Sequence, residues 1–351
     1  MNSRNKATIL PPIQAIEVTG RNGIHFTAAT IAAFLCSPLY PMRLCRSCLL
    51  AALMLALSSA FAAPLAVPAA ADPALPYVLK DTEVRTLHAE HLARDYELFI
   101  GLPPSYGSGQ RRYPVVFVTD APYAFPLTRA IAARVTGHSK EMPEFILVGL
   151  GYAKGDTGEF SRRRDYTPSA HGDRDATSDM PGRAVIYGGA EGYRRFVAEE
   201  VFPFIASHYR ADMGHKVFAG HSYGSLFGAW VMLTAPEMFD GYVLGSPSLW
   251  FDDYLLMARE HAFADTHRDL RARVYLGAGE YEALSPKDRP HDARYNTDQD
   301  MVADTQAFAR ALAAHHYPGL KVRSDVIAGE DHLTVAPVLI TRGLLWTLGG
   351  K

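Results

Sequence analysis

The 351-residue sequence predicts an α/β fold, a single domain whose mostly parallel central sheet carries helices on both faces. Two observations favour this fold class. Short apolar runs alternate with amphipathic, helix-like segments from residue 78 onward, which is typical of parallel strands buried on both faces. The composition, 48% hydrophobic and 21% charged, is that of a globular protein, and the chain is long enough to bury a sizeable core.

The expected strands are short runs of mainly apolar residues, and they lie at 83–88, 94–102, 114–119, 145–150, 216–220, 241–245 and 273–278. The expected helices have apolar residues at helical spacing, and they lie at 125–135, 188–209, 223–234, 299–316 and 335–348. Two long polar loops, at 152–184 and about 280–300, interrupt the alternation. Ligands of open α/β sheets bind beyond the carboxyl ends of the strands, where both loops emerge, so we expect the loops to border a site. The alternative is that both are solvated insertions.

The N-terminal region reads as a targeting segment rather than as part of the fold. Residues 42–62 combine two arginines, an apolar run and a small-x-small site at Ala60-Phe61-Ala62, as in a secretory signal peptide. Residues 1–41 then form a mis-assigned upstream region, 63–77 an Ala/Pro-rich linker and 78–351 the α/β domain. An uncleaved N-terminal anchor is the alternative.

Cysteine content and charge exclude several function classes. All three cysteines, Cys36, Cys45 and Cys48, precede or lie in the signal, so the mature domain has no disulfide, cysteine nucleophile or cysteine-based zinc site. Removing residues 1–62 leaves 30 Lys and Arg against 36 Asp and Glu, a formal charge of −6. This balance does not indicate binding to nucleic acid or to an anionic membrane surface. The sequence indicates no oligomeric state.

The stretch FAGHSYGSLFGAW, residues 218–230, places Ser222 between Gly220 and Gly224. This spacing matches G-x-S-x-G, in which a strand turns sharply into a helix and holds the serine in a strained backbone at the apex. The apolar run before it reads as a short strand, and the segment 225–239 after it has helical spacing. The context favours a nucleophilic serine over a simple Gly/Ser turn.

A serine hydroxyl needs a base within hydrogen-bond reach and an acid that orients the base, in the chain order Ser, acid, His on this fold. The downstream histidines are His261, His267, His291, His315, His316 and His332. His332, in SDVIAGEDHLTVAPV, follows the last predicted strand, where a loop can hang over the serine. We therefore expect His332 to be the base. The alternative is a loop histidine bonded to a neighbouring carboxylate.

Three carboxylates compete for the role of the acid. Glu280 and Glu282 both follow the strand in RVYLGAGEYEAL, and by position alone they are nearly tied, while Asp292 is a more distant candidate. Either glutamate can accept a hydrogen bond from the imidazole and stabilise its charged form.

The reaction also needs donors for an oxyanion. One is expected to be the backbone N–H of Tyr223, the residue after the serine. The other should come from the loop after PVVFVTD, where Pro122 has no N–H. Ala121 or Tyr123 must supply it, and we expect Tyr123.

Several of these motifs together resemble the esterase D / enterochelin esterase-like family of α/β-hydrolases, over about residues 92–348. The motifs are FIGLPPSYGSGQRRYPVVFVTDAPYAF, FAGHSYGSLFGAW, GYVLGSPSLWF, VYLGAGEYE and GEDHLTV. The resemblance implies an α/β-hydrolase fold and places the acid at Glu282. It also implies hydrolysis of esters such as siderophore trilactones, feruloyl-sugar esters or S-formylglutathione, or acyl transfer. The sequence departs from the family at Ala121-Pro122, where glycine and an N–H donor are usual.

Substrate contacts are less sharply indicated. Arginines 162–164 on the first polar loop can clamp an anionic substrate, with Arg164 the candidate, although Arg164 can instead pair with Asp165. Trp250 can wall the acyl pocket or belong to the core. No helix begins after Gly149-x-Gly151, so we do not expect this segment to bind a dinucleotide. We also expect no other cofactor and no metal.

The predicted function is a secreted or periplasmic serine esterase that acts on a small-molecule ester through an acyl-enzyme on Ser222. An acyltransferase of the same fold and a catalytically impaired, hydrolase-like binding protein are the alternatives.

Overall fold

The structure is a computed structural model that describes residues 75–349, except 137, 139–140, 174 and 286–291. The chain from Pro76 to Lys351 forms one compact unit. The expectations for residues 1–41 and 42–62, and for most of the linker 63–77, fall outside the described residues.

A single eight-stranded sheet runs through this unit in the order β1-β2-β4-β3-β5-β6-β7-β8. The strands are β1 (Thr82–Ala89), β2 (Arg94–Gly101), β3 (Tyr113–Val118), β4 (Ile146–Ala153), β5 (Ala211–His221), β6 (Gly241–Gly245), β7 (Ala272–Gly279) and β8 (Leu320–Ile327). Only the β1-β2 and β2-β4 pairs are antiparallel. The remaining six strands in this order, β4, β3, β5, β6, β7 and β8, are parallel to one another. This confirms the predicted mostly parallel sheet.

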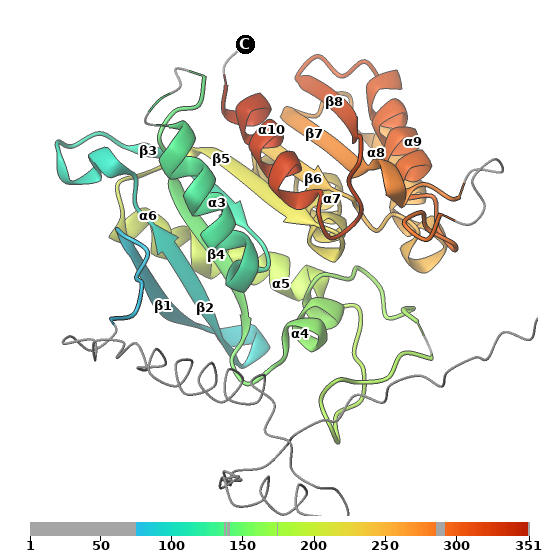
Figure 1. Cartoon of the computed structure of the whole chain (residues 1–351), viewed down its shortest axis with the longest axis horizontal. Helices are drawn as coiled ribbons and strands as arrows, with labels where there is room; N and C mark the ends of the chain where they lie inside the picture. The colour runs from blue at the N-terminus through green and yellow to red at the C-terminus, as the bar shows by residue number, and fades with distance from the viewer. Residues whose placement is uncertain (1–74, 137, 139–140, 174, 286–291, 350–351) are drawn as a thin grey trace, which may run out of the picture. The chain divides into compact units, whose positions relative to one another are not determined.

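Helices cover both faces of the sheet (Figure 1). The α-helices are α3 (Ala121–Val135), α4 (Gly158–Asp165), α5 (Ala190–Phe196), α6 (Phe202–His208), α7 (Tyr223–Thr234), α8 (Phe251–Thr266), α9 (Met301–Ala314) and α10 (Ala336–Leu348). Because alternate side chains of a strand point to opposite faces, β3 divides its residues between two apolar clusters. Val115 and Phe117 join the cluster that includes α7, while Val116 and Val118 join the one beneath α3 and α10.

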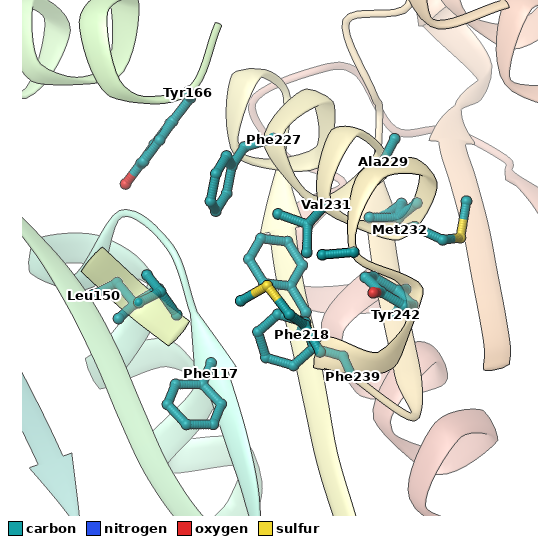
Figure 2. Close-up of a cluster of buried hydrophobic side chains, with 14 of the residues drawn as sticks. Phe117, Leu150, Tyr166, Phe218, Phe227, Ala229, Val231, Met232, Phe239 and Tyr242 are labelled. Atoms are coloured by element: carbon teal, nitrogen blue, oxygen red, sulfur yellow. The ribbon is translucent and has the colours of Figure 1, made fainter. Parts of the chain in front are cut away.

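An aromatic core fixes the strand and the helix on either side of Ser222. Figure 2 shows Phe218 of β5, Phe227 of α7 and Tyr242 of β6 among the buried side chains of this cluster. The ring centroids of Phe218 and Phe227 lie 5.9 Å apart. Since each aromatic ring buries a large apolar area, this contact holds β5 and α7 at a fixed angle.

Five features differ from the sequence-based expectations. Strand β8 was not predicted, and α4 lies inside the segment read as a polar loop. Helix α8 was not among the predicted helices, and α3 begins at Ala121 rather than at residue 125. The predicted helix 188–209 is present, but a π-helical turn at Val197–Val201 separates α5 from α6. The early start of α3 changes the interpretation of the site.

Among the described helices, none has both the length and the apolar composition needed to cross a membrane.

Candidate active site

Ser222 lies at the turn between β5 and α7, as the G-x-S-x-G spacing predicted. Its backbone has φ 58° and ψ −122°, a conformation that L-residues rarely adopt. The Ser222 N–H donates to Gly245 O at 2.9 Å, which ties the turn to the end of β6. Backbone strain of this kind persists only where the surrounding structure enforces it. Because the turn follows β5, the serine lies at the carboxyl end of that strand.

The two glycines of the motif are required by close packing. A Cβ on Gly220 would lie 2.6 Å from the backbone of Gly224, and a Cβ on Gly224 would lie 2.3 Å from Oγ1 of Thr119. Both separations are shorter than any van der Waals contact allows, so larger residues would force β5, β3 and α7 apart.

His332 and Glu282 form a hydrogen-bonded pair beside this turn. His332 Nδ1 lies 2.6 Å from Glu282 Oε2, and Glu282 is only 1% exposed. Glu282 follows β7, and His332 lies in the loop between β8 and α10. A carboxylate in this position fixes the ring orientation and favours the tautomer with its proton on Nδ1, leaving Nε2 free to accept a proton.

The competing carboxylates lie elsewhere. Glu280 accepts a hydrogen bond from Gly329 N–H at 2.9 Å, so it supports the backbone of the β8–α10 loop. Asp292 forms an ion pair with Arg294 at 2.7 Å. Of the three carboxylates, only Glu282 is hydrogen-bonded to His332, the position that the family resemblance favoured.

A second histidine, His221, packs against the candidate base. The ring centroids of His221 and His332 lie 4.5 Å apart. Burial, and then the nearby His332, lower the pKa of His221 to about 3. Its Nε2 is buried and has no hydrogen-bond partner among the described residues. His221 is therefore a neutral ring near neutral pH.

Ser222 and His332 line one pocket of about 460 Å³. The other lining residues are Tyr123, Tyr152, Gly158, Glu159, Arg162, His221, Leu333 and Ala336. The N-terminal parts of α3 and α4 therefore form one side of the pocket, and the loop before α10 forms the other. Leu333, beside His332, is 86% exposed at the pocket rim.

Arg162 is the cation of this pocket, and Asp120 holds it in place. Arg162 Nε lies 2.9 Å from Asp120 Oδ1, which also accepts a hydrogen bond from the Tyr152 hydroxyl at 2.8 Å. Asp120 is fully buried, and this burial raises its pKa although Arg162 opposes the rise. Arg162 Nη1 also lies 3.8 Å from Glu159 Oε2, and Glu159 lies closer to Arg163.

The structure does not support the sequence-based role of the Tyr123 N–H. That N–H donates to Asp120 O at 3.1 Å within the first turn of α3, so it is not free for an oxyanion. The prediction was wrong because α3 begins at Ala121, two residues earlier than Tyr123. Tyr123 instead lines the pocket, and Pro122 occupies an N-terminal helical position where a missing N–H costs nothing.

Arg164 and Trp250 do not line the pocket. The Arg164 side chain is 3% exposed and pairs with Asp165 at 2.7 Å and with Asp156 at 2.5 Å. Its guanidinium is therefore committed to the interior, which corrects the prediction that it contacts substrate. Trp250 packs against the apolar core, with its ring centroid 6.1 Å from that of Tyr223.

Sequence reasoning missed Tyr152, Glu159, His221 and Leu333, and it named Arg162 only as one of three arginines. A helix-start signal could have found part of this set. Thr157 caps α4 by accepting a hydrogen bond from Phe160 N–H, and Glu159 lies in the first turn. If the segment 158–165 is taken as a helix, Arg162 and Arg164 lie on different faces of that helix.

Among the described residues, no group of three or more His, Cys, Asp or Glu side chains is placed to hold a metal ion.

The chain matches the family described as "Putative esterase" over residues 89–328. It is 32% identical over 282 residues to ferri-bacillibactin esterase BesA of Bacillus subtilis (strain 168), which covers 78% of this chain and 91% of the relative. It is 24% identical over 248 residues to the siderophore triacetylfusarinine C esterase of Aspergillus fumigatus, covering 68% and 82% of the two chains.

Solved structures share the fold. The BES protein from Bacillus cereus matches with a TM-score of 0.65 and 23% identity, covering 78% of this chain and 98% of that one. The siderophore hydrolase EstA from Aspergillus nidulans matches with a TM-score of 0.64 and 19% identity, covering 78% and 96%. With a family match over most of the described chain and a relative 32% identical, this protein belongs to the enterochelin esterase-like family of the α/β-hydrolase superfamily.

Proposed function

We propose that the protein is a serine esterase in which Ser222 is the nucleophile, His332 the general base and Glu282 the acid that orients it. The observation that carries this proposal is the 2.6 Å hydrogen bond between His332 and Glu282 beside a pocket that Ser222 and His332 both line. The strained turn at Ser222 supports it.

The reaction proceeds in two stages. In the first, His332 Nε2 takes the Ser222 proton as the hydroxyl oxygen attacks the ester carbonyl. The imidazolium then protonates the leaving alcohol, and an acyl-enzyme remains on Ser222. In the second stage, His332 activates a water molecule, which releases the acid and restores the serine. Glu282 stabilises the imidazolium in both stages and stays ionised.

Two backbone N–H groups are proposed as oxyanion donors. Tyr223 is the first residue of α7, and Ala121 is the first residue of α3. The first N–H groups of a helix have no partner within the helix, and the positive end of the helix dipole favours a developing negative charge. Ala121 is the remaining backbone candidate of its loop, because Pro122 has no N–H and the Tyr123 N–H is engaged.

The proposed substrate is an ester that carries an acidic or anionic group and an apolar or aromatic part, such as a siderophore trilactone. Arg162 lines the pocket, and it takes the anion-binding role first considered for Arg164. Tyr123 and Leu333 present apolar surface at the rim. The two relatives above are named as esterases of siderophores, which supports the same substrate class.

Residues 42–62 support secretion or a periplasmic location. An acyltransferase that uses an alcohol in place of water is the second candidate, because the same acyl-enzyme serves both reactions. A catalytically impaired binding protein remains the alternative from a different class, motivated by Pro122.

A substrate panel tests the proposal. We expect the purified protein to hydrolyse ferric and iron-free trilactone siderophores and simple nitrophenyl esters, with the trilactones giving the higher kcat/KM. Sugar and glycerol acceptors in the same assay reveal acyl transfer through transesterified product. Binding of trilactones without any hydrolysis would overturn the esterase proposal in favour of the impaired binder.

A further inference from the structure

Ser246 lies in the loop after β6, and nothing in the reaction above uses it. Its backbone has φ 43°, in the left-handed region that serine rarely occupies, and the residue is fully buried. The Ser246 N–H donates to Gly277 O at 2.7 Å, which ties this conformation to the neighbouring strand β7. A buried serine held in a strained conformation calls for a physical reason.

The Ser246 hydroxyl donates to Glu282 Oε1 at 2.6 Å. The same oxygen accepts the Gly279 N–H at 2.7 Å, while Oε2 lies 2.6 Å from His332 Nδ1. The carboxylate is thus held from two sides, with its Oε1 bound by two donors and its Oε2 presented to the imidazole. A carboxylate that is 1% exposed has no bulk water to replace a lost donor.

Gly279 and Ser246 constrain Glu282 differently. The Gly279 N–H belongs to the backbone of the turn that carries Glu282 itself, so it fixes the carboxylate only relative to its own chain segment. Ser246 belongs to a different loop, after β6, the strand that also accepts the Ser222 N–H through Gly245 O. The Ser246 contact therefore links the acid to the strand that supports the nucleophile.

We propose that Ser246 is a positioning residue, which holds Glu282 in the orientation that aligns His332 with Ser222. This inference rests on the proposed triad. Ser246 contacts none of the reacting atoms, and it acts only through the carboxylate of Glu282. The left-handed backbone aims the hydroxyl at Oε1.

A double-mutant cycle separates this role from a merely structural one. Ser246→Ala removes the hydroxyl, and Ser246→Gly removes it while accommodating φ 43° without strain. We expect each to lower kcat about ten- to a hundredfold, as for the loss of a hydrogen bond to a charged group, with KM within about twofold. In a Glu282→Ala background the same changes should lower kcat less than about twofold further.

Rates are expressed per active site titrated with a fluorophosphonate, so that misfolded protein does not contribute. Three outcomes would overturn the inference: an unchanged kcat in both Ser246 variants, full activity restored by glycine alone, or the same loss in the Glu282→Ala background. If Glu282→Ala itself leaves kcat unchanged, the proposed triad is wrong, a result distinct from failure of the Ser246 inference alone.

Discussion

The two sides of the pocket are built differently. On one side, Glu282 follows β7 and His332 follows β8. Both oxygens of the Glu282 carboxylate have hydrogen-bond partners. On the other side, Asp120 and Arg162 lie at the N-terminus of α3 and in α4. There the Asp120 Oδ2 is buried without a partner among the described residues.

This difference in hydrogen bonding suggests that one side orients the catalytic imidazole and the other binds substrate. A carboxylate with hydrogen-bond partners on both oxygens can hold an imidazole in one orientation through repeated turnovers. A cation that lines a pocket can exchange one polar partner for another, as substrate binding requires. We therefore propose that the side formed after β7 and β8 carries out the chemistry and that the side formed by α3 and α4 recognises the substrate.

The largest expected effect tests the chemical side. Ser222→Ala and His332→Ala should each lower kcat about a million-fold, because residues that act as a unit lose nearly everything together. His261→Ala is the matched control, since its side chain is 73% exposed, and it should retain normal kcat. A serine or histidine variant with more than a tenth of the normal rate would exclude the proposed pair.

Glu282→Ala should lower kcat about ten-thousandfold, less than the serine change, because the acid orients the base but does not itself take the proton. Glu280→Ala is the matched control two residues away. It should stay within a few-fold of the normal rate, because the Glu280 carboxylate accepts a hydrogen bond from the loop backbone at Gly329 and not from His332. If steady-state kinetics show the Glu280 variant to be the slower one, the acid has been misplaced.

Arg162→Gln and Arg164→Gln should both lower stability, because each removes the cation paired with a buried carboxylate, but only Arg162→Gln should change recognition. The Arg162 variant should lose about tenfold in kcat/KM on nitrophenyl hemisuccinate but little on neutral nitrophenyl acetate, because it loses one charge-assisted contact. The Arg164 variant leaves buried Asp165 unpaired and should lose about 3–5 kcal/mol of unfolding free energy in denaturant titrations. Equal losses on both esters for Arg162→Gln would instead make Arg162 an oxyanion donor.

Part of the geometry on the chemical side could be predicted because short motifs encode backbone geometry. The spacing of Gly220, Ser222 and Gly224 indicated the turn between β5 and α7. His332 was chosen because its loop follows the last strand of the chain, although β8 itself was not among the expected strands. The choice of Glu282 over Glu280 came from family resemblance, since spacing alone could not decide which side chain turns inward.

The recognition side was predicted poorly for physical reasons. Strand β8, which belongs to the chemical side, was missed as well, because it is an edge strand with polar residues along its length and lacks the apolar run that marks a buried strand. The segment of α4 was read as a polar loop because it contains three consecutive arginines. In the structure it is a helix, with Arg162 lining the pocket and Arg164 buried in the interior. Sequence spacing could not show that Arg162 pairs with Asp120 beside the pocket while Arg164 pairs with Asp165 in the interior.

His221 also lines the pocket. Its titration should make the unfolding free energy of the protein sensitive to acid. Burial holds its folded pKa near 3, below the ordinary value of 6.5, so below pH 6.5 the unfolded state binds a proton that the folded state does not. Unfolding free energy should therefore fall as pH drops from 6.5 toward 3, with this residue contributing about 2 kcal/mol of loss by pH 5.

His221→Asn removes this titration, whatever it does to stability at neutral pH. Denaturant titrations at pH 7 and pH 5 should show a smaller acid-induced loss in the variant than in the natural protein. An identical loss in both proteins would place the acid sensitivity in other groups.

The smallest effect is expected for Pro122→Gly. The change adds an N–H at a position where the first turn of α3 does not need one, and it loosens the helix start. With Ala121 and Tyr223 as the oxyanion donors, kcat should stay the same or fall slightly. A rise of tenfold or more would show that the natural protein lacks a second donor and would favour the impaired-binder alternative.

The most direct test of the central claim, that Ser222 is a nucleophile activated by His332 and Glu282, is labelling with a fluorophosphonate followed by peptide mapping. We expect one phosphonyl group per protein, on Ser222, with no label in Ser222→Ala and much slower labelling in His332→Ala. Ser225 and Ser248 lie in the same region and serve as internal controls that should remain unlabelled. Label on another serine, or esterase activity that survives complete labelling of Ser222, would contradict the account.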